Sequence, residues 1–151
     1  MIFITVAIIF FLDRFTKIYF DNNLPLNHQV PLIKGVLSFT LVHNRGAAFG
    51  MLMNQLPVFI FSALLAIILI YFNLKKNRGR GLSLYNFSLS LILAGALGNL
   101  FDRIRFGYVI DFIDLGFWPV FNIADSAITL GAILLGWHIL FAGQKDKTCI
   151  L

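Results

Sequence analysis

The chain has 151 residues, of which 59% are hydrophobic and only 13% are charged. Soluble domains contain roughly 45–50% apolar and about 25% charged residues, so the composition indicates an integral membrane protein and excludes an ordinary soluble enzyme. The net charge of +5 needs no nucleic-acid partner, because basic residues that face anionic lipid headgroups account for it.

Four apolar stretches are long enough to cross a bilayer, which takes roughly 17–25 residues of helix. They cover about residues 2–20, 57–74, 84–101 and 123–142. We therefore predict a single integral membrane domain over residues 1–151, of the all-α class, with four transmembrane helices.

In the first stretch, Asp13 and Lys17 are four residues apart and share one face of the predicted helix. Their side chains can neutralise each other there. We favour this structural role over a direct chemical one.

The connector of about residues 21–56 contains a strand-like pattern. Residues 30–33 and 36–42 are rich in β-branched and aromatic side chains, with Gly35 between them. We predict a short antiparallel β element on the outer membrane face, between the first and second helices. Asn44 and Gly46 follow it in a segment of small residues, 43–50, which leaves room for the backbone of an extended substrate. A plain loop before the second helix is the alternative.

The orientation of the chain follows from its basic residues. The connector of residues 75–80 carries four basic residues and no acidic one. Under the positive-inside rule this loop and both termini lie in the cytoplasm. The other two connectors, and with them Asp111 and Asp125, then face the outside.

The third stretch ends in residues that can serve packing and chemistry. Residues 94–98 are all small except Leu97, a pattern typical of tightly packed transmembrane helices. Asn99 and Arg103 are four residues apart and therefore share a helix face.

Asp111 and Asp125 each adjoin an apolar segment. A carboxylate at the membrane edge requires a partner, a water-filled cavity or a raised pKa. Two carboxylates that share one proton activate water in aspartic proteases, so this pair indicates hydrolysis. The alternatives are structural: Asp125 only stabilises the start of the fourth helix, beside the N-cap candidate Asn122, and Asp111 is a solvated loop residue.

Other hydrolytic chemistries lack their residues in this sequence. The chain has no glutamate, which excludes the HExxH motif of metalloproteases. It has no GxSxG motif for a serine nucleophile. The three histidines, at positions 28, 43 and 138, are scattered and no CxxC occurs, so we expect no metal site.

Five sequence blocks, in this order, resemble the lipoprotein signal peptidase family, the bacterial signal peptidase II aspartic endopeptidases. Together they extend over nearly the whole chain. The blocks are LDRFTK (residues 12–17), NRGAAFG (44–50), GALGNLFDR (95–103), GYVIDF (107–112) and FNIAD (121–125).

The resemblance implies that Asp111 and Asp125 are the catalytic dyad of an enzyme that removes the signal peptide from diacylglyceryl-modified prolipoproteins, just before the lipidated cysteine. It also implies a bacterial cytoplasmic (inner) membrane location, a β cradle on the outer leaflet, contact with membrane lipids, inhibition by globomycin, and no metal or organic cofactor. We expect a monomer. The residues that would support the site or the substrate are Asp13, Lys17, Asn44, Gly46, Asn99, Arg103 and Asn122.

A different class of protein also accounts for acidic residues at a membrane. This alternative is a non-catalytic membrane protein that uses the paired aspartates to bind an ion or a proton.

Overall fold

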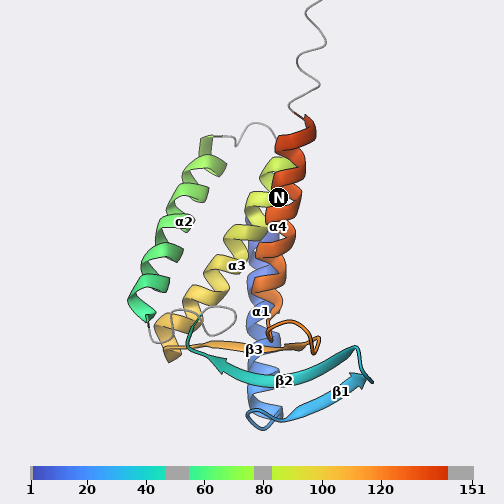
Figure 1. Cartoon of the computed structure of the whole chain (residues 1–151). Helices are drawn as coiled ribbons and strands as arrows, with labels where there is room; N and C mark the ends of the chain where they lie inside the picture. Colours follow the sequence, from blue (N-terminus) through green and yellow to red (C-terminus); the bar gives the residue numbers. More distant parts are fainter. Residues whose placement is uncertain (1, 47–54, 77–82, 143–151) are drawn as a thin grey trace, which may run out of the picture.

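The computed structural model describes residues 2–46, 55–76 and 83–142. Across these residues a bundle of long helices meets a small sheet, which lies across one end of the bundle (Figure 1). The helices are α1 (Ile2–Asn23), α2 (Leu56–Lys76), α3 (Leu84–Phe106) and α4 (Ile123–Ala142), and the strands are β1 (Gln29–Ile33), β2 (Leu37–Asn44) and β3 (Val109–Asp114).

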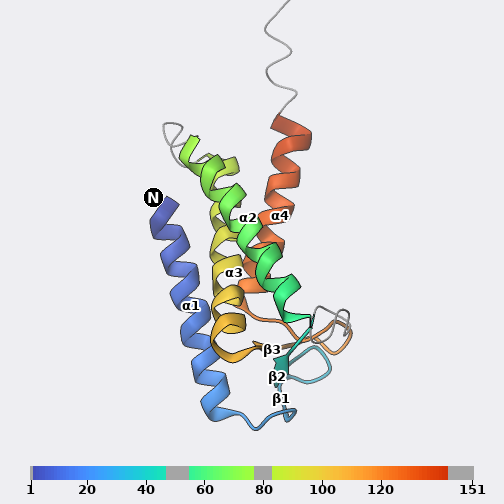
Figure 2. The same ribbon diagram turned by 90° about the vertical axis from the view of Figure 1, so that its left-hand side faces the viewer.

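Helix α3 lies at the centre of the bundle and packs against α1, α2 and α4 (Figures 1 and 2). The outer helices present large apolar side chains to their surroundings, for example Phe61 on α2 and Leu140 on α4, which are 70% and 68% exposed. Exposed side chains of this size and number are normal for surfaces that lipid covers and abnormal for surfaces in water.

Glycines set the close approach of α3 and α4. A Cβ atom on Gly95 would lie 2.3 Å from the carbonyl oxygen of Ala124, and one on Gly131 would lie 2.7 Å from the carbonyl oxygen of Ser88. Any larger residue at either position would push the helices apart. The prediction that the small residues of the third stretch serve helix packing is therefore confirmed.

Three helices, α2, α3 and α4, are long and apolar enough to cross a membrane. Helix α1 is of similar length, at 22 residues, but it contains Asp13, Arg14 and Lys17. All three side chains are buried inside the protein and not turned toward its surroundings.

The third predicted helix is longer than expected. We predicted its end near residue 101, where charged residues begin, but α3 continues to Phe106. It ends at Gly107, which has a φ of 78° and donates its N–H to the carbonyl oxygen of Arg103. The helix continues because the side chains of Asp102 and Arg103 have partners inside the protein.

The predicted β element is present, but the prediction omitted one of its strands. β1 and β2 form the expected antiparallel pair, and β2 extends to Asn44. A third strand, β3, pairs antiparallel with β2, so that Val42 lies opposite Asp111 and Asn44 lies opposite Val109. Because β3 leads from α3 to α4, the sheet joins the two halves of the sequence.

Strand β3 corrects the alternative interpretation of Asp111 as a solvated loop residue. Asp111 is only 2% exposed, and its neighbours in the strand, Ile110 and Phe112, are also buried. Phe112 stacks on Phe20 at the end of α1, with 4.3 Å between the ring centroids. Strand β3 therefore pairs with β2 along one edge and packs against α1, and this position fixes where the Asp111 side chain lies.

Candidate active site

Asp111 and Asp125 approach the same point from different elements, and Asn122 lies between them. The side-chain N–H of Asn122 donates to Asp111 over 2.6 Å. The side-chain oxygen of the same amide accepts the backbone N–H of Asp125 over 2.9 Å. One asparagine thus holds both aspartates.

The start of α4 orients the Asp125 side chain. Asn122 is the N-cap residue, as predicted, and Asp125 returns the interaction by accepting the backbone N–H of Asn122 over 3.3 Å. This reciprocal arrangement is a capping box with Asp at its third helical position. The alternative prediction, that Asp125 stabilises the start of the helix, is therefore correct for one of its carboxylate oxygens. The other oxygen accepts a hydrogen bond from Asn99.

Strand β2 supplies the second partner of Asp111. Asn44 donates its side-chain N–H to Asp111 Oδ2, the carboxylate oxygen that Asn122 does not contact, over 2.9 Å. The oxygen of the Asn44 amide accepts the backbone N–H of Gly46 over 2.9 Å. Since the side-chain oxygen of Asn44 accepts from Gly46, the side-chain NH₂ group of Asn44 must point at the Asp111 carboxylate.

Asn99 connects the two carboxylates to the interior of the bundle. Its N–H donates to Asp125 over 2.7 Å, and its oxygen accepts from Asn122 over 3.2 Å. The same oxygen accepts from Lys17 over 2.9 Å. A lysine ammonium group carries only donors, so this contact determines which end of the Asn99 amide faces Asp125.

Behind Asn99 lies a buried ion cluster that we define as Asp13, Arg14, Lys17 and Asp102. The Lys17 Nζ atom is 2.9 Å from Asp13 Oδ2 and 2.8 Å from Asp102 Oδ2, and the Arg14 guanidinium pairs with the other oxygen of Asp102. The two positive charges of Arg14 and Lys17 neutralise the two negative charges of Asp13 and Asp102. The predicted pairing of Asp13 with Lys17 is confirmed, as one part of a larger cluster.

Asp13 also reaches the helix that carries Asp125. Its Oδ1 atom accepts the backbone N–H of Ala124 over 2.9 Å. A Cβ atom on Gly98 would lie 2.6 Å from the other Asp13 oxygen. The absence of a side chain at position 98 therefore lets α1 stabilise the first turn of α4.

Arg14 and Asp102 belong to this network, and we did not predict a site role for either. Asp102 additionally accepts the backbone N–H of Ile110 over 3.4 Å, next to Asp111. A signal was available, because ionisable residues inside an apolar helix are costly and mark functional sites. Their pairing across 88 positions of sequence left no local pattern to detect.

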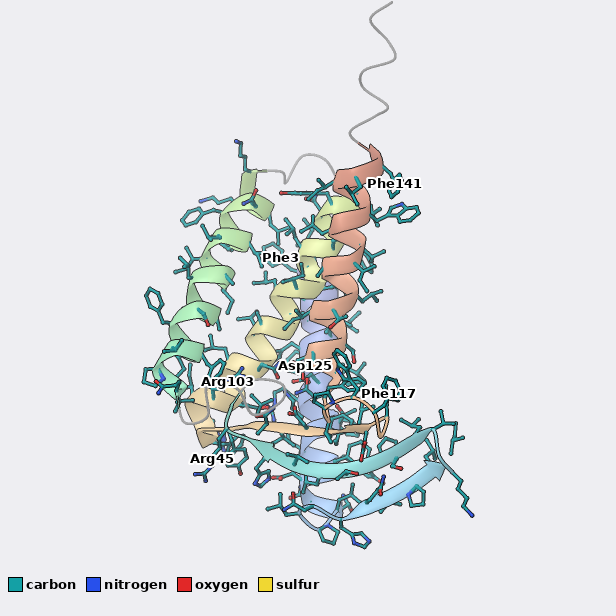
Figure 3. All side chains as sticks on the ribbon, in the orientation of Figure 1. Phe3, Arg45, Arg103, Phe117, Asp125 and Phe141 are labelled. Carbon is teal, nitrogen blue, oxygen red and sulfur yellow. The ribbon has the colours of Figure 1, made fainter. Side chains whose placement is uncertain are left out.

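Arg103 lies on the same side of α3 as Asn99, as the four-residue spacing predicted. Its guanidinium carbon is 4.9 Å from the centroid of the Phe59 ring on α2, which is within range of a cation–π contact. Figure 3 places Arg103 and Asp125 together where the bundle meets the sheet.

These side chains surround a cavity of about 300 Å³, which we call the polar pocket. Its walls come from α2, α3, α4, β2, β3 and the segment before α4. The predicted site residues that line it are Asn44, Gly46, Asn99, Arg103 and Asp125.

The surroundings of Asp111 alter its acidity. Burial raises the pKa of this carboxyl group most, and the nearby charge of Asp125 raises the pKa further. The hydrogen bonds from Asn44 and Asn122 lower the pKa, because they favour the charged form. The balance raises the pKa of Asp111 to about 7, so at neutral pH the protonated and ionised forms are both well populated.

Comparisons with known proteins show which family this chain is similar to. The family model described as signal peptidase (SPase) II matches residues 5–141. The lipoprotein signal peptidase of Caldanaerobacter subterraneus is 48% identical over 145 residues, which cover 95% of this chain and 98% of that protein. The lipoprotein signal peptidase of Halothermothrix orenii is 43% identical over 147 residues, covering 97% and 98%.

A solved structure has the same fold. It is described as a bacterial membrane enzyme determined by the in meso method at 2.3 Å resolution. It superposes with a TM-score of 0.86 at 30% sequence identity, covering 99% of this chain and 91% of that one.

Proposed function

The chain belongs to the signal peptidase II family, and we propose that it is an aspartic endopeptidase that removes the signal peptide from diacylglyceryl-modified prolipoproteins. Cleavage falls just before the lipidated cysteine. The observation that carries the aspartic assignment is the pair Asp111 and Asp125, which Asn122 joins by hydrogen bonds to both. Of the pair, Asp125 lines the polar pocket.

In the proposed mechanism the two carboxyl groups divide the work. Asp125 is ionised, since the N–H groups of Asn99 and Asn122 and the positive end of the α4 dipole stabilise its charge. Asp111 carries the proton, in keeping with a pKa raised to about 7. Asp125 takes a proton from water as the water oxygen attacks the scissile carbonyl carbon, and Asp111 donates a hydrogen bond to the carbonyl oxygen.

The second half of the reaction returns the protons. Asp125 passes its proton to the amide nitrogen as the carbon–nitrogen bond breaks, which releases the new amino group of the lipidated cysteine. As the oxyanion of the tetrahedral intermediate re-forms the carbonyl group, Asp111 keeps its proton and Asp125 is again ionised, so the dyad holds one proton as at the start, and the new carboxylic acid loses its proton to water. Arg103 and Asn44 line the polar pocket and are suited to bind the carbonyl oxygens of the substrate backbone.

The non-catalytic alternative is less consistent with the hydrogen bonds. A cation bound between Asp111 and Asp125 would need free carboxylate oxygens. Three of these oxygens instead accept side-chain N–H groups from Asn44, Asn99 and Asn122. Amide donors aimed at a carboxylate pair suit proton chemistry better than cation binding.

We further propose four membrane spans in the bacterial cytoplasmic membrane, with both termini and the basic loop inside. The start of α1, the end of α2 and the end of α4 lie at the end of the bundle opposite the sheet (Figure 1). Lys75 and Lys76 end α2 there, while the remainder of the basic loop lies outside the described residues. Asp111 and Asp125 then lie near the outer face, and α1 spans because its charges are buried against α3.

The direct experiment uses the purified full chain in detergent micelles with two synthetic peptides. Both carry a signal sequence and a cysteine, and only one cysteine is S-diacylglyceryl-modified. Mass spectrometry should locate the cleavage immediately before the modified cysteine. Addition of globomycin should stop this cleavage. Cleavage of the unmodified peptide at an equal rate, or of neither peptide, would contradict the proposal. The active species should elute as a monomer.

A further inference from the structure

A small cavity lies at the end of the bundle opposite the sheet, where α1 begins and α2 ends (Figures 1 and 2). We call it the lateral crevice, and its volume is about 80 Å³. None of its described lining residues also lines the polar pocket, so the crevice is separate from the proposed active site. These residues are Ile2 and Phe3 of α1, Tyr71, Leu74 and Lys75 of α2, and Leu93 of α3.

The packing of the helices produces the lateral crevice. Helices α1 and α2 each pack along α3, but within the described part of the chain they make almost no contact with each other. The buried side chain of Leu93 on α3 therefore forms the floor, and the crevice opens between the two outer helices. Phe3 and Tyr71 are 62% and 47% exposed, so the opening faces the lipid that surrounds the bundle.

The size and lining of the crevice suit a segment of one hydrocarbon chain. A pocket for a drug-sized ligand or a cofactor usually measures about 300–1,000 Å³, which is several times the volume of this crevice. The side chains of Ile2, Phe3, Leu74 and Leu93 offer no hydrogen-bonding group. A peptide backbone placed there would lose its partners, at a cost of roughly 2–7 kcal/mol for each polar group removed from water. An acyl chain has no such groups.

The two polar side chains of the crevice come from one face of α2. Tyr71 and Lys75 are four residues apart, so they lie one turn apart on the same side of the helix. Lys75 belongs to the last turn, and Tyr71 lies about 6 Å nearer the middle of the bundle. No described acidic side chain forms an ion pair with Lys75. The ammonium group can therefore donate to a phosphate at the mouth of the crevice.

The charges around the crevice favour an anionic headgroup. The connector of residues 75–80 carries four basic residues and no acidic one. Of the seven acidic residues, Asp146 lies outside the described residues, and the other six lie in the sheet, in the buried ion cluster, or at the sheet ends of α1 and α4. The crevice end of the bundle consequently attracts a headgroup with net negative charge and repels the choline cation of a zwitterionic lipid.

From these observations we propose that the lateral crevice binds one anionic phospholipid. Its phosphate lies against Lys75, within reach of the Tyr71 hydroxyl, and one of its acyl chains lies on Leu93 between α1 and α2. The lipid fills the space that these two helices leave between them and so stabilises the bundle. Under the proposed orientation this is the cytoplasmic leaflet, which contains anionic lipids. The inference does not depend on the catalytic assignment of the dyad.

Two lysine variants separate a bound lipid from a general attraction. Lys75→Gln and Lys76→Gln each remove one positive charge from the last turn of α2, but only Lys75 lines the crevice. The purified full chain in an uncharged detergent, with about 0.15 M salt, is titrated with phosphatidylglycerol or with phosphatidylcholine of the same chains. Glycerol phosphate, a headgroup without chains, is the third ligand. Native mass spectrometry counts the bound molecules and gives each Kd.

We expect the wild type to bind one phosphatidylglycerol at least about tenfold more tightly than phosphatidylcholine, and glycerol phosphate far more weakly than either. Lys75→Gln should weaken phosphatidylglycerol binding about tenfold, as loss of a hydrogen bond to a charged group does. Lys76→Gln should weaken it less than about threefold, because salt screens a charge that does not touch the lipid. Equal losses in the two variants, equal binding of the two lipids, or glycerol phosphate binding as tight as that of phosphatidylglycerol would overturn the inference.

Unfolding temperatures show whether the variants are folded and whether the lipid stabilises the bundle. Without lipid, the wild type and both variants should unfold at the same temperature. Phosphatidylglycerol at about ten times the wild-type Kd should raise the unfolding temperature of the wild type by about 4 °C, and that of Lys75→Gln by about 1 °C. Lys76→Gln should lie closer to the wild type. Equal increases in the two variants would contradict a site at Lys75.

Photolabelling locates the acyl chain. Phosphatidylglycerol with a diazirine near the ester end of one chain is bound to the wild type, irradiated, and the adducts are mapped by mass spectrometry. We expect adducts on Ile2, Phe3 or Leu93. Adducts confined to α4, or spread evenly over the lipid-facing side chains of all the described helices, would overturn the inference.

Discussion

Lys17 donates to the side-chain oxygen of Asn99 over 2.9 Å, and this contact turns the N–H end of the Asn99 amide toward Asp125. A cation on α1 thus orients a hydrogen bond made by α3 to a carboxylate on α4. The buried ion cluster consequently supports the proposed dyad as well as the bundle.

Lys17→Met should test this support. It leaves the buried carboxylates of Asp13 and Asp102 with only Arg14 as a cation, so we expect a destabilisation of about 3–5 kcal/mol, typical of breaking a buried ion pair. Thermal unfolding of the purified protein in detergent measures it. Lys75→Met is the control, since Lys75 is exposed at the end of α2. Equal unfolding temperatures for the two variants would contradict the role of the cluster.

Asn122→Ala should separate stability from activity. Loss of a helix N-cap costs about 1 kcal/mol, whereas loss of the contact that positions both Asp111 and Asp125 should lower kcat about 100-fold, as a displacement of about 1 Å does. The measurements are the unfolding temperature and kcat on a lipopeptide. Asn23→Ala, which removes an exposed hydrogen bond to the Tyr19 carbonyl, should leave kcat unchanged. A kcat for Asn122→Ala near the wild-type value would refute the bridging role.

Gly98→Ala should impair the protein although alanine is the better helix former. The added Cβ atom would lie 2.6 Å from the Asp13 carboxylate and displace it from Ala124. We expect a lower unfolding temperature together with reduced kcat. Gly136→Ala, on α4 with no atom within 4 Å of the new Cβ, should instead stabilise by roughly 0.5–1 kcal/mol. A Gly98→Ala protein as stable as Gly136→Ala would contradict the close contact.

Much of this arrangement could be predicted from the sequence, and the failures have physical reasons. Apolar length located the helices, and the spacing of Asn99 and Arg103 correctly indicated a shared face. The end of α3 was placed too early because Asp102 and Arg103 looked like the edge of the membrane, whereas their charges are compensated by partners in the fold. Strand β3 was missed because its six residues, Val109–Asp114, were interpreted as part of a connector, and its partner β2 lies far away in the sequence.

The pH dependence of cleavage should follow Asp111. If the protonated form of Asp111 is the active one, kcat/KM falls as pH rises through about 7, the value to which burial and Asp125 raise its pKa. Asn44→Ala removes a hydrogen bond that favours the charged form, so the pKa rises further and the falling limb moves to higher pH. Profiles between about pH 5 and 9 at low substrate concentration measure both. A limb that stays in place, or moves to lower pH, would exclude Asp111 as the group that titrates.

The central claim is that Asp111 and Asp125 carry out the chemistry together, and three aspartate-to-asparagine variants test it most directly. Asp111→Asn and Asp125→Asn keep the shape of each side chain but remove the exchangeable proton. Asp114→Asn is the matched control on the same strand, where the carboxylate accepts from Thr40 and not from the dyad's partners.

The measurement is kcat on a diacylglyceryl-modified peptide, with the unfolding temperature recorded for each variant. We predict that each dyad variant loses at least about 100-fold in kcat, that the double variant is no worse than either single one because the pair acts as a unit, and that Asp114→Asn cleaves normally. A folded Asp111→Asn or Asp125→Asn protein that turns over substrate at a rate near that of Asp114→Asn would contradict the account.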